Sequence, residues 1–140
     1  MINFQSESDS LPSEIDNGLI SWIERVILSH NCKCGELNYF FCSDEYILQT
    51  NRDFLNHDYY TDIITFDNCI GNIITGDLVI SLDTVKSNSV LLSIDYTSEL
   101  HRVIIHGILH LIGFKDASDD DKRVMRQQED AALKLLPTFL

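Results

Sequence analysis

Apolar residues recur in the amino-terminal part of the chain at intervals of three and four positions. The residues on this spacing are Ile15, Leu19, Trp22, Ile23, Val26 and Ile27. Because this spacing places side chains on one face of an α-helix, it predicts an amphipathic helix of about four to five turns. Pro12 is expected in its first turn, where the missing N–H group of proline costs little.

Short runs of β-branched and aromatic residues are typical of strands. These runs cover residues 2–5, 35–42, 62–66 and 73–82. Gly71 and Asn72 lie between the last two runs and form a turn signal, so we expect a hairpin or two neighbouring strands there. The strands alternate with helices too rarely for a doubly wound sheet.

Further helices are predicted from capping residues and apolar spacing. Their expected ranges are 43–54, from about 83 onward, 97–112 and 118–135. Ser43 and Ser118 can each cap the helix that they begin, and Asp121 completes an acidic variant of the capping box with Ser118. Together these elements predict one α+β domain over residues 1–140, with a single mixed β-sheet and helices packed mainly on one face.

The composition narrows the class of protein. A chain of 140 residues with 44% hydrophobic content suits one globular domain. The first residues lack the basic and apolar regions of a signal peptide, and the longest apolar stretch is too short to span a bilayer. We therefore expect a cytoplasmic protein with no membrane segment. The four cysteines do not follow the spacing of paired zinc knuckles and are expected to be reduced thiols.

The formal net charge of −12 opposes non-specific attraction to nucleic acid. Lys and Arg provide most of the affinity for phosphate groups, so a nucleic-acid substrate would need a local positive region. Basic residues gather after residue 114, at Lys115, Lys122, Arg123 and Arg126. Acidic residues 119–121 dilute this cluster, so a solvated helix face is the favoured interpretation and a binding site is the alternative.

The segment HGILHLIGFKD, residues 106–116, carries the clearest chemical signal. His106 and His110 are one helical turn apart, so both can contact one ion, although two packed histidines would give the same spacing. Gly113 can end the helix and let the chain turn back, which would bring Asp116 to the same ion. Zn²⁺ accepts such a set and keeps a fourth position for water.

Gly107 argues against a peptidase. Zincin peptidases carry their general-base glutamate directly after the first histidine, and Gly107 occupies that position here. The remaining chemistry is attack by a metal-activated water on a phosphorus or carbonyl centre. A hydrolase of small phosphoesters is compatible with the same three ligands.

Three motifs follow one another along the chain: TDIITF (61–66), GDLVIS (76–81) and HGILHLIGF (106–114), followed by Met125 and Glu129. In this order they resemble the YbeY family of bacterial endoribonucleases and rRNA maturation factors. The resemblance implies a zincin-like metalloprotein that binds zinc and cleaves single-stranded RNA in the maturation of the small-subunit rRNA 3′ end and in ribosome quality control. The small ribosomal subunit or its assembly proteins would be its partners.

The resemblance also implies site residues. The family's ligands follow the pattern H-x3-H-x5-H, which His106 and His110 match directly, and the third position falls on Asp116. A carboxylate makes the site harder, so zinc is our first choice, and Mn²⁺ or another divalent ion is an alternative. The family places an arginine where this chain has Leu55, and Arg52, one helical turn earlier, is expected to substitute for it.

Phosphodiester cleavage also requires cations that hold the phosphate. Lys115, next to the ligand set in sequence, and Arg52 are the expected catalytic residues. Arg102 is expected instead to pair with Glu99 on an exposed helix surface. The absent arginine and the acidic net charge leave a second function open, that of a ribosome-associated assembly or interaction protein with weak or lost nuclease activity.

Three residues near the motif have simpler expected roles. His101 is five positions before His106, which turns it away from the ligands, and it is expected at the surface. Met125 is expected to pack under the site. Glu129 is expected either to support a ligand from behind or to be a surface charge on its helix.

Overall fold

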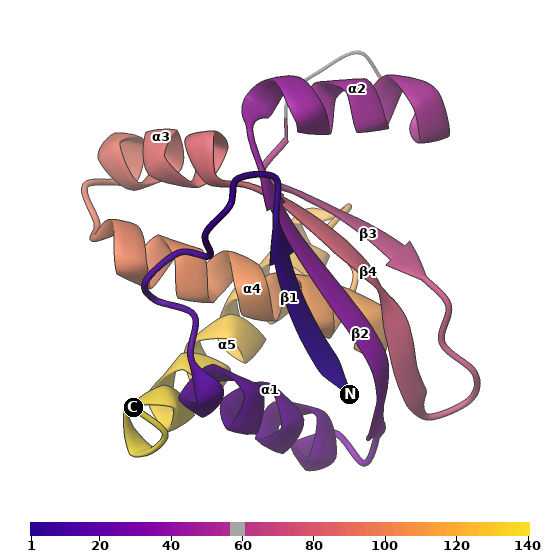
Figure 1. The fold of residues 1–140 in the computed structure, drawn as a ribbon. Helices are drawn as coiled ribbons and strands as arrows, with labels where there is room; N and C mark the ends of the chain where they lie inside the picture. Colours follow the sequence, from indigo (N-terminus) through magenta and orange to yellow (C-terminus); the bar gives the residue numbers. More distant parts are fainter. Residues whose placement is uncertain (57–60) are drawn as a thin grey trace.

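The computed structural model describes residues 1–56 and 61–140, and every predicted helix and strand is present within them. The strands are β1 (Ile2–Ser6), β2 (Lys33–Cys42), β3 (Ile63–Asp67) and β4 (Ile73–Ser81). The helices are α1 (Asn17–Ser29), α2 (Asp44–Leu55), α3 (Leu82–Leu92), α4 (Tyr96–Ile112) and α5 (Asp119–Leu135), and a short 3-10 helix follows at Leu136–Thr138. Figure 1 shows their arrangement.

The four strands form one mixed sheet in the order β1-β2-β4-β3. β1 pairs with β2, and β2 with β4, in parallel, whereas β3 and β4 are antiparallel with Ile63 opposite Ile80. The predicted turn joins β3 and β4, and Gly71 adopts a φ of 58° there, a conformation that favours glycine. The predicted α+β class with a single mixed sheet is therefore confirmed.

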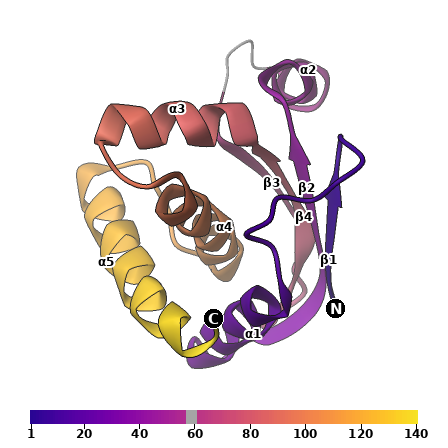
Figure 2. The same ribbon diagram turned by 60° about the vertical axis from the view of Figure 1, so that its left-hand side comes forward.

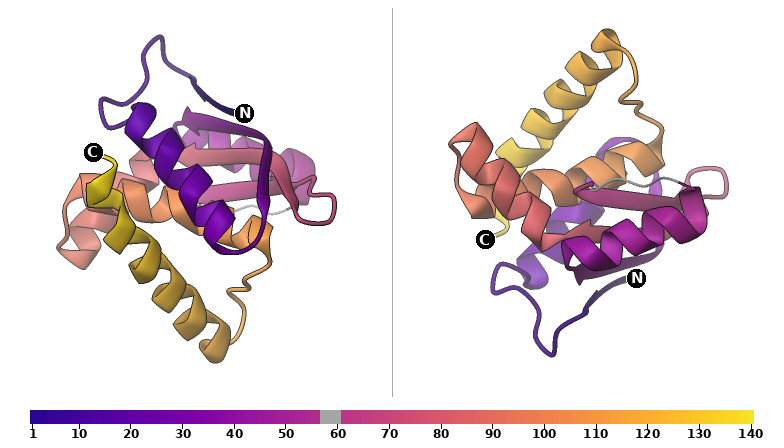
Figure 3. Two further views of the ribbon diagram at one scale, coloured as in Figure 1. Left: turned by 90° about the horizontal axis from the view of Figure 1, so that it is seen from below. Right: turned by 90° about the horizontal axis from the view of Figure 1, so that it is seen from above.

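The helices cover the two faces of the sheet unequally. Leu78 and Ile80 of β4 point into the main core, which is shared with α1, α4 and α5, while Val79 points to the other face and packs near Ile47 of α2. Helix α4 lies between the sheet and α5 (Figures 2 and 3). Helices therefore pack mainly on one face, as predicted, and α2 is the helix on the other face.

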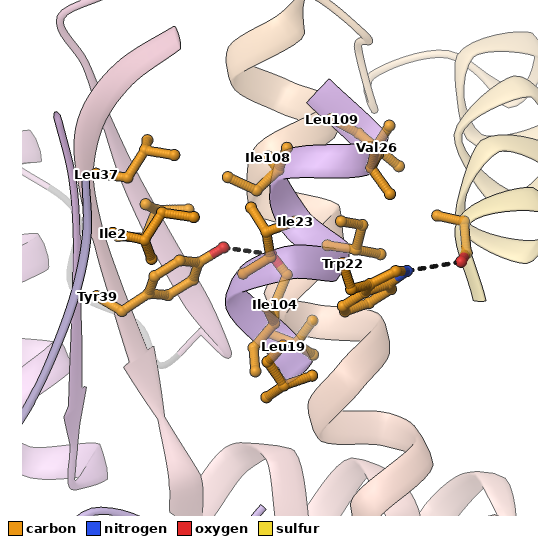
Figure 4. Packing of buried hydrophobic residues seen from close by; sticks show 14 of the residues in the cluster. Ile2, Leu19, Trp22, Ile23, Val26, Leu37, Tyr39, Ile104, Ile108 and Leu109 are labelled. Carbon is orange, nitrogen blue, oxygen red and sulfur yellow. Dashed lines mark hydrogen bonds between the residues drawn. The ribbon is translucent and has the colours of Figure 1, made fainter. Parts of the chain in front are cut away.

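Buried contacts fix the position of α4 at the centre of this core (Figure 4). The Tyr39 hydroxyl of β2 donates a hydrogen bond to the Ile104 carbonyl oxygen at 2.9 Å. Gly107 faces the sheet so closely that a Cβ atom there would lie 2.5 Å from Leu78 Cδ2. On the far side of the core, Trp22 Nε1 donates to the Ala132 carbonyl oxygen of α5 at 2.8 Å. These contacts fix α4 on the sheet and α5 on α1, and α4 and α5 carry the site described below.

Helix α1 begins later than the sequence pattern predicted. Its N-cap is Asp16, whose side chain accepts a hydrogen bond from the Leu19 N–H at 3.1 Å, so the prediction of Pro12 in the first turn is wrong. The four cysteines are free thiols, as predicted, and Cys42 is buried. None of the helices within the described residues combines the length and apolar character needed to cross a bilayer.

Candidate metal site

Helix α4 and the turn after it bring three ligand-type side chains together. Gly113 ends α4 with a φ of 127°, and the Phe114 N–H donates to the Leu109 carbonyl oxygen as the chain turns back. One potential ligand atom from each of His106, His110 and Asp116 lies within 4.8 Å of the others. This group could hold a metal ion, as its spacing in the sequence predicted.

The ligand atoms are spaced suitably for one ion. His106 Nε2 and Asp116 Oδ2 are 3.7 Å apart. Two ligand atoms at the usual zinc distances would be about 3.4 Å apart in a tetrahedral site, so a small movement of the exposed carboxylate would suffice.

His110 is held in the tautomer that a metal requires. Its Nδ1 lies 2.9 Å from the Phe114 carbonyl oxygen, and because a carbonyl only accepts, Nδ1 must carry the proton. The Nε2 lone pair is therefore available for an ion. Burial lowers the pKa of His110, and the neighbouring His106 lowers it further, which favours the neutral form that binds metals.

His106 is supported by a buried carboxylate. Its Nδ1 lies 2.6 Å from Glu129 Oε2 of α5, which directs Nε2 toward Asp116. Arg102 donates to Glu129 at 3.3 Å and also to both carboxylate oxygens of Glu99, at 2.8 and 2.5 Å. The two glutamates are almost completely buried. Glu129 thus supports a ligand from behind, which was one of its two expected roles.

Charge interactions favour the ionised forms of Glu129 and Arg102. Burial alone would raise the pKa of Glu129, but the hydrogen bond with His106 and the charge of Arg102 lower it overall. The hydrogen bonds with Glu99 raise the pKa of Arg102. Asp62, just before β3, has a raised pKa because its burial outweighs the nearby positive charge of Arg102. The electrostatics therefore preserve a charged support behind His106.

A cleft of about 230 Å³ opens beside these ligands. Its lining residues are Arg102, His106, Asp116, Lys122, Met125, Arg126 and Glu129. Met125 is buried at the base of α5, in agreement with its predicted place under the site. Two of the three ligand-type residues, His106 and Asp116, are therefore exposed in this cleft.

Comparison with known proteins agrees with this arrangement. The family model described as Endoribonuclease YbeY matches residues 1–137. The chain belongs to the YbeY family. The Endoribonuclease YbeY of Porphyromonas gingivalis is 53% identical over 135 residues, which cover 96% of this chain and 89% of that protein. The Endoribonuclease YbeY of Parabacteroides distasonis is 48% identical over 136 residues, covering 97% and 96% of the two chains. The family predicted from the three motifs is thus confirmed.

A solved structure shares the fold of this chain. The solution structure of the protein TM1509 from Thermotoga maritima superposes with a TM-score of 0.72 and covers 97% of this chain and 89% of that one. The two sequences are 23% identical. This likeness supports the overall fold, and the site depends on the residues of the present chain.

Of the two expected catalytic cations, Lys115 lies near the candidate ligands and Arg52 lies far from them in the fold. Lys115 is exposed and adjoins Asp116 in the turn after α4. Arg52 lies on α2, which packs on the opposite face of the sheet from α4. Neither residue is among those that line the cleft. Their catalytic roles stay predictions.

Two expectations about α4 residues need correction. His101 is buried beside the Trp22 ring of α1, with ring centroids 6.2 Å apart, so its predicted surface position is wrong. Its Nε2 atom has no hydrogen-bond partner within the described part of the chain. Arg102 pairs with Glu99 as predicted, but its side chain is only 16% exposed because α5 covers it.

Sequence reasoning did not identify the two cations that α5 brings to the cleft. Lys122 and Arg126 were seen only as part of a diluted basic cluster, yet both line the cleft together with His106 and Asp116. Their separation of four residues, which puts both on one helix face, was the available signal.

Proposed function

We propose that this YbeY-family chain is a metal-dependent endoribonuclease that cleaves single-stranded RNA during maturation of the small-subunit rRNA 3′ end and in ribosome quality control. The grouping of His106, His110 and Asp116, two of which line an open cleft, carries the proposal. Relatives of similar length are named endoribonucleases, which supports RNA as the substrate. Its partners are then rRNA and the small ribosomal subunit or its assembly proteins, and its location is cytoplasmic.

The three ligand-type residues would hold one divalent ion. Zinc is the first choice because two neutral imidazoles and a carboxylate suit it, and the carboxylate also makes Mn²⁺ acceptable. When bound, the ion supplies a Lewis acid that activates water and polarises the phosphoryl group. His106 and His110 are oriented for this task by Glu129 and by the Phe114 carbonyl oxygen.

The residues around the ligands act on the substrate. Asp116 is the most exposed of the three, with 38% of its side chain accessible, so the open side of the site is where the strand approaches. Lys115, adjacent to this ligand, is proposed to contact phosphate oxygens beside the ion. Arg52 lies on α2, on the other face of the sheet, and is proposed to contact a phosphate farther along the strand. Such contacts stabilise the charge that develops during phosphodiester cleavage.

A cleavage assay tests this function. The purified protein is incubated with a single-stranded RNA and with a duplex of the same sequence, with and without a chelator. We expect cleavage of the single strand, its loss in chelator and its return with Zn²⁺ or Mn²⁺. His110→Ala should abolish cleavage and Arg123→Ala, outside the cleft, should not. Undiminished cleavage by the His106→Ala, His110→Ala double variant would show that another site or a contaminant is responsible.

Leu55 favours a second candidate function. It lies at the end of α2, is 40% exposed and has no charge to offer a phosphate, although the resemblance places an arginine there. A ribosome-associated assembly protein with little nuclease activity would tolerate this change. Binding to small-subunit precursors without any cleavage of their rRNA, in the presence of Zn²⁺ or Mn²⁺, would favour this second function.

A further inference from the structure

We propose that Lys122 and Arg126 of α5 form a phosphate-binding edge on the metal cleft, where they hold a backbone phosphate of a single-stranded RNA. The proposal rests on the proposed function, since it takes RNA as the ligand. It assigns the recognition of the RNA backbone to α5, a helix that contributes no metal ligand.

The two side chains belong to the same wall of the cleft. Lys122 and Arg126 are four residues apart, so they project from one face of α5. Both line the cleft that also exposes His106 and Asp116. Met125, which is buried, lines the cleft with them. A group bound beside the ligands would therefore meet both cations.

The Arg126 charge is available to a substrate, whereas the Arg102 charge is already used. Arg102 is held by Glu99 and Glu129 and is largely buried. Arg126 lies 4.0 Å from Glu129, the outer limit for an ion pair, and its side chain is 60% exposed. Only the Glu129 side of this pair is buried, and Arg102 and His106 already contact that carboxylate. The Arg126 guanidinium therefore stays mostly in solvent, where it can contact a phosphate.

The charge balance of the cleft differs from that of the whole chain. Since Arg102 is paired with Glu99 and Glu129, the other charged residues of the lining are the cations Lys122 and Arg126 and the carboxylate Asp116, whereas the formal net charge of the chain is −12. A divalent ion at the site would add further positive charge. Lys122 and Arg126 can thus attract an anionic phosphodiester to the cleft, while the acidic surface of the rest of the chain repels it.

Arg123 provides a matched control on the same helix. It is exposed, lies 3.9 Å from Asp120 and is not part of the cleft lining. Arg123→Ala changes the net charge by the same amount as Arg126→Ala. Any difference in RNA binding between the two variants therefore results from the position of the lost charge and not from the change in net charge.

The test is the binding of a fluorescently labelled single-stranded oligoribonucleotide, followed by anisotropy in chelator, so that cleavage does not consume the probe. Kd is measured over a range of salt concentrations for the unaltered protein and for each variant. Lys122→Ala and Arg126→Ala should each weaken binding several-fold and reduce the slope of log Kd against log salt by about 0.7, the value for one lost phosphate contact on a single strand. Arg123→Ala should leave both quantities unchanged, and Arg126→Lys should restore most of the slope.

The binding and cleavage results together distinguish a failure of the phosphate-binding edge from a failure of the proposed nuclease function. Equal effects of all three alanine variants, no effect of any, or no measurable binding by the unaltered protein would overturn the phosphate-binding edge. If the unaltered protein binds RNA through these residues but never cleaves it with Zn²⁺ or Mn²⁺, the nuclease function fails and the edge stands. If the Lys122 and Arg126 variants bind and cleave like the unaltered protein, the edge fails and the nuclease function stands.

Discussion

Each histidine of the metal site is held through its Nδ1 atom, which leaves Nε2 as the available ligand atom. His110 uses a backbone oxygen of the following turn, and His106 uses Glu129 of another helix. The partner behind a ligand fixes its tautomer and orientation, so loss of that partner lowers metal affinity even though it touches no ion. Glu129 is therefore a positioning residue.

Glu129→Gln is expected to weaken metal binding by about 10- to 100-fold, because the charge behind His106 is lost and Arg102 is left with one carboxylate partner. A competition titration of Zn²⁺ against a fluorescent chelator measures this change. Asp130→Asn, an exposed acid on the same helix, should not alter the affinity. Equal zinc affinities for the two variants would show that Glu129 is only a buried charge.

Asp116→His is expected to raise the ratio of Zn²⁺ to Mn²⁺ affinity, because imidazole is a softer ligand than carboxylate. This substitution produces the three-histidine set that the family resemblance implies. Titrating each ion against the same chelator gives the two affinities in both proteins. An unchanged ratio would mean that residue 116 does not contact the ion.

His101 is expected to destabilise the protein in acid. Burial lowers its pKa from the usual 6.5, so below that value the unfolded chain takes up a proton that the folded state excludes. Its contribution to stability is thus complete above pH 6.5 and declines as the pH falls toward the lower folded value. The free energy of unfolding, measured by urea titration across this range, should fall less steeply in His101→Leu. His30 and His110, whose pKa values are also lowered, remain in both proteins, so an identical slope would contradict the assignment.

At the scale of single residues the sequence predicted the candidate ligand group, but it left two roles open for Glu129, support of a ligand or a surface charge. His106, His110 and Asp116 are within eleven positions of one another, and helical geometry brings them together locally. The contact between His106 and Glu129 spans 23 positions and depends on how α5 packs on α4. The burial of His101 likewise depends on α1, which no local spacing reveals.

The start of α5 shows how an element supports the site. Ser118 Oγ accepts a hydrogen bond from the Asp121 N–H at 3.0 Å, and the Asp121 carboxylate accepts one from the Ser118 N–H at 3.2 Å. This is the predicted capping box, and it fixes the first turn of the helix that carries Lys122 and Arg126. By contrast, the helix start predicted around Pro12 was wrong, because the Asp16 side chain caps α1 and determines its boundary.

Ser118→Ala is expected to lower the free energy of unfolding by about 1 kcal/mol, as measured by urea titration, because this is the usual cost of losing an N-cap.

The Ser118 N–H lowers the pKa of Asp121, so this carboxylate stabilises the folded state above the pKa of an unfolded aspartate. That stabilisation is lost as the pH falls through the lower folded value. Urea titrations at neutral and acid pH should therefore show a smaller effect of Asp121→Asn in acid. A constant difference would exclude the charged cap.

For the whole molecule, local sequence patterns could not predict the order of the strands in the sheet, but they could predict where the candidate site lies. The β3–β4 hairpin follows from its turn, but the parallel pairing of β1 with β2, and of β2 with β4, depends on connections through α1, α2 and the hairpin. The packing of α2 on the other face of the sheet could not be predicted from the sequence either. The three ordered motifs nevertheless identified the family, because they occupy strands and the helix around the metal site.

The metal content of the purified protein tests the central claim most directly, namely that His106, His110 and Asp116 hold one divalent ion. Elemental analysis by mass spectrometry should find about one ion per chain in the unaltered protein and in Asp130→Asn, as expected for a single three-ligand site. The His106→Ala, His110→Ala double variant should contain almost none while remaining folded by circular dichroism. A stoichiometric ion in that double variant would contradict the account.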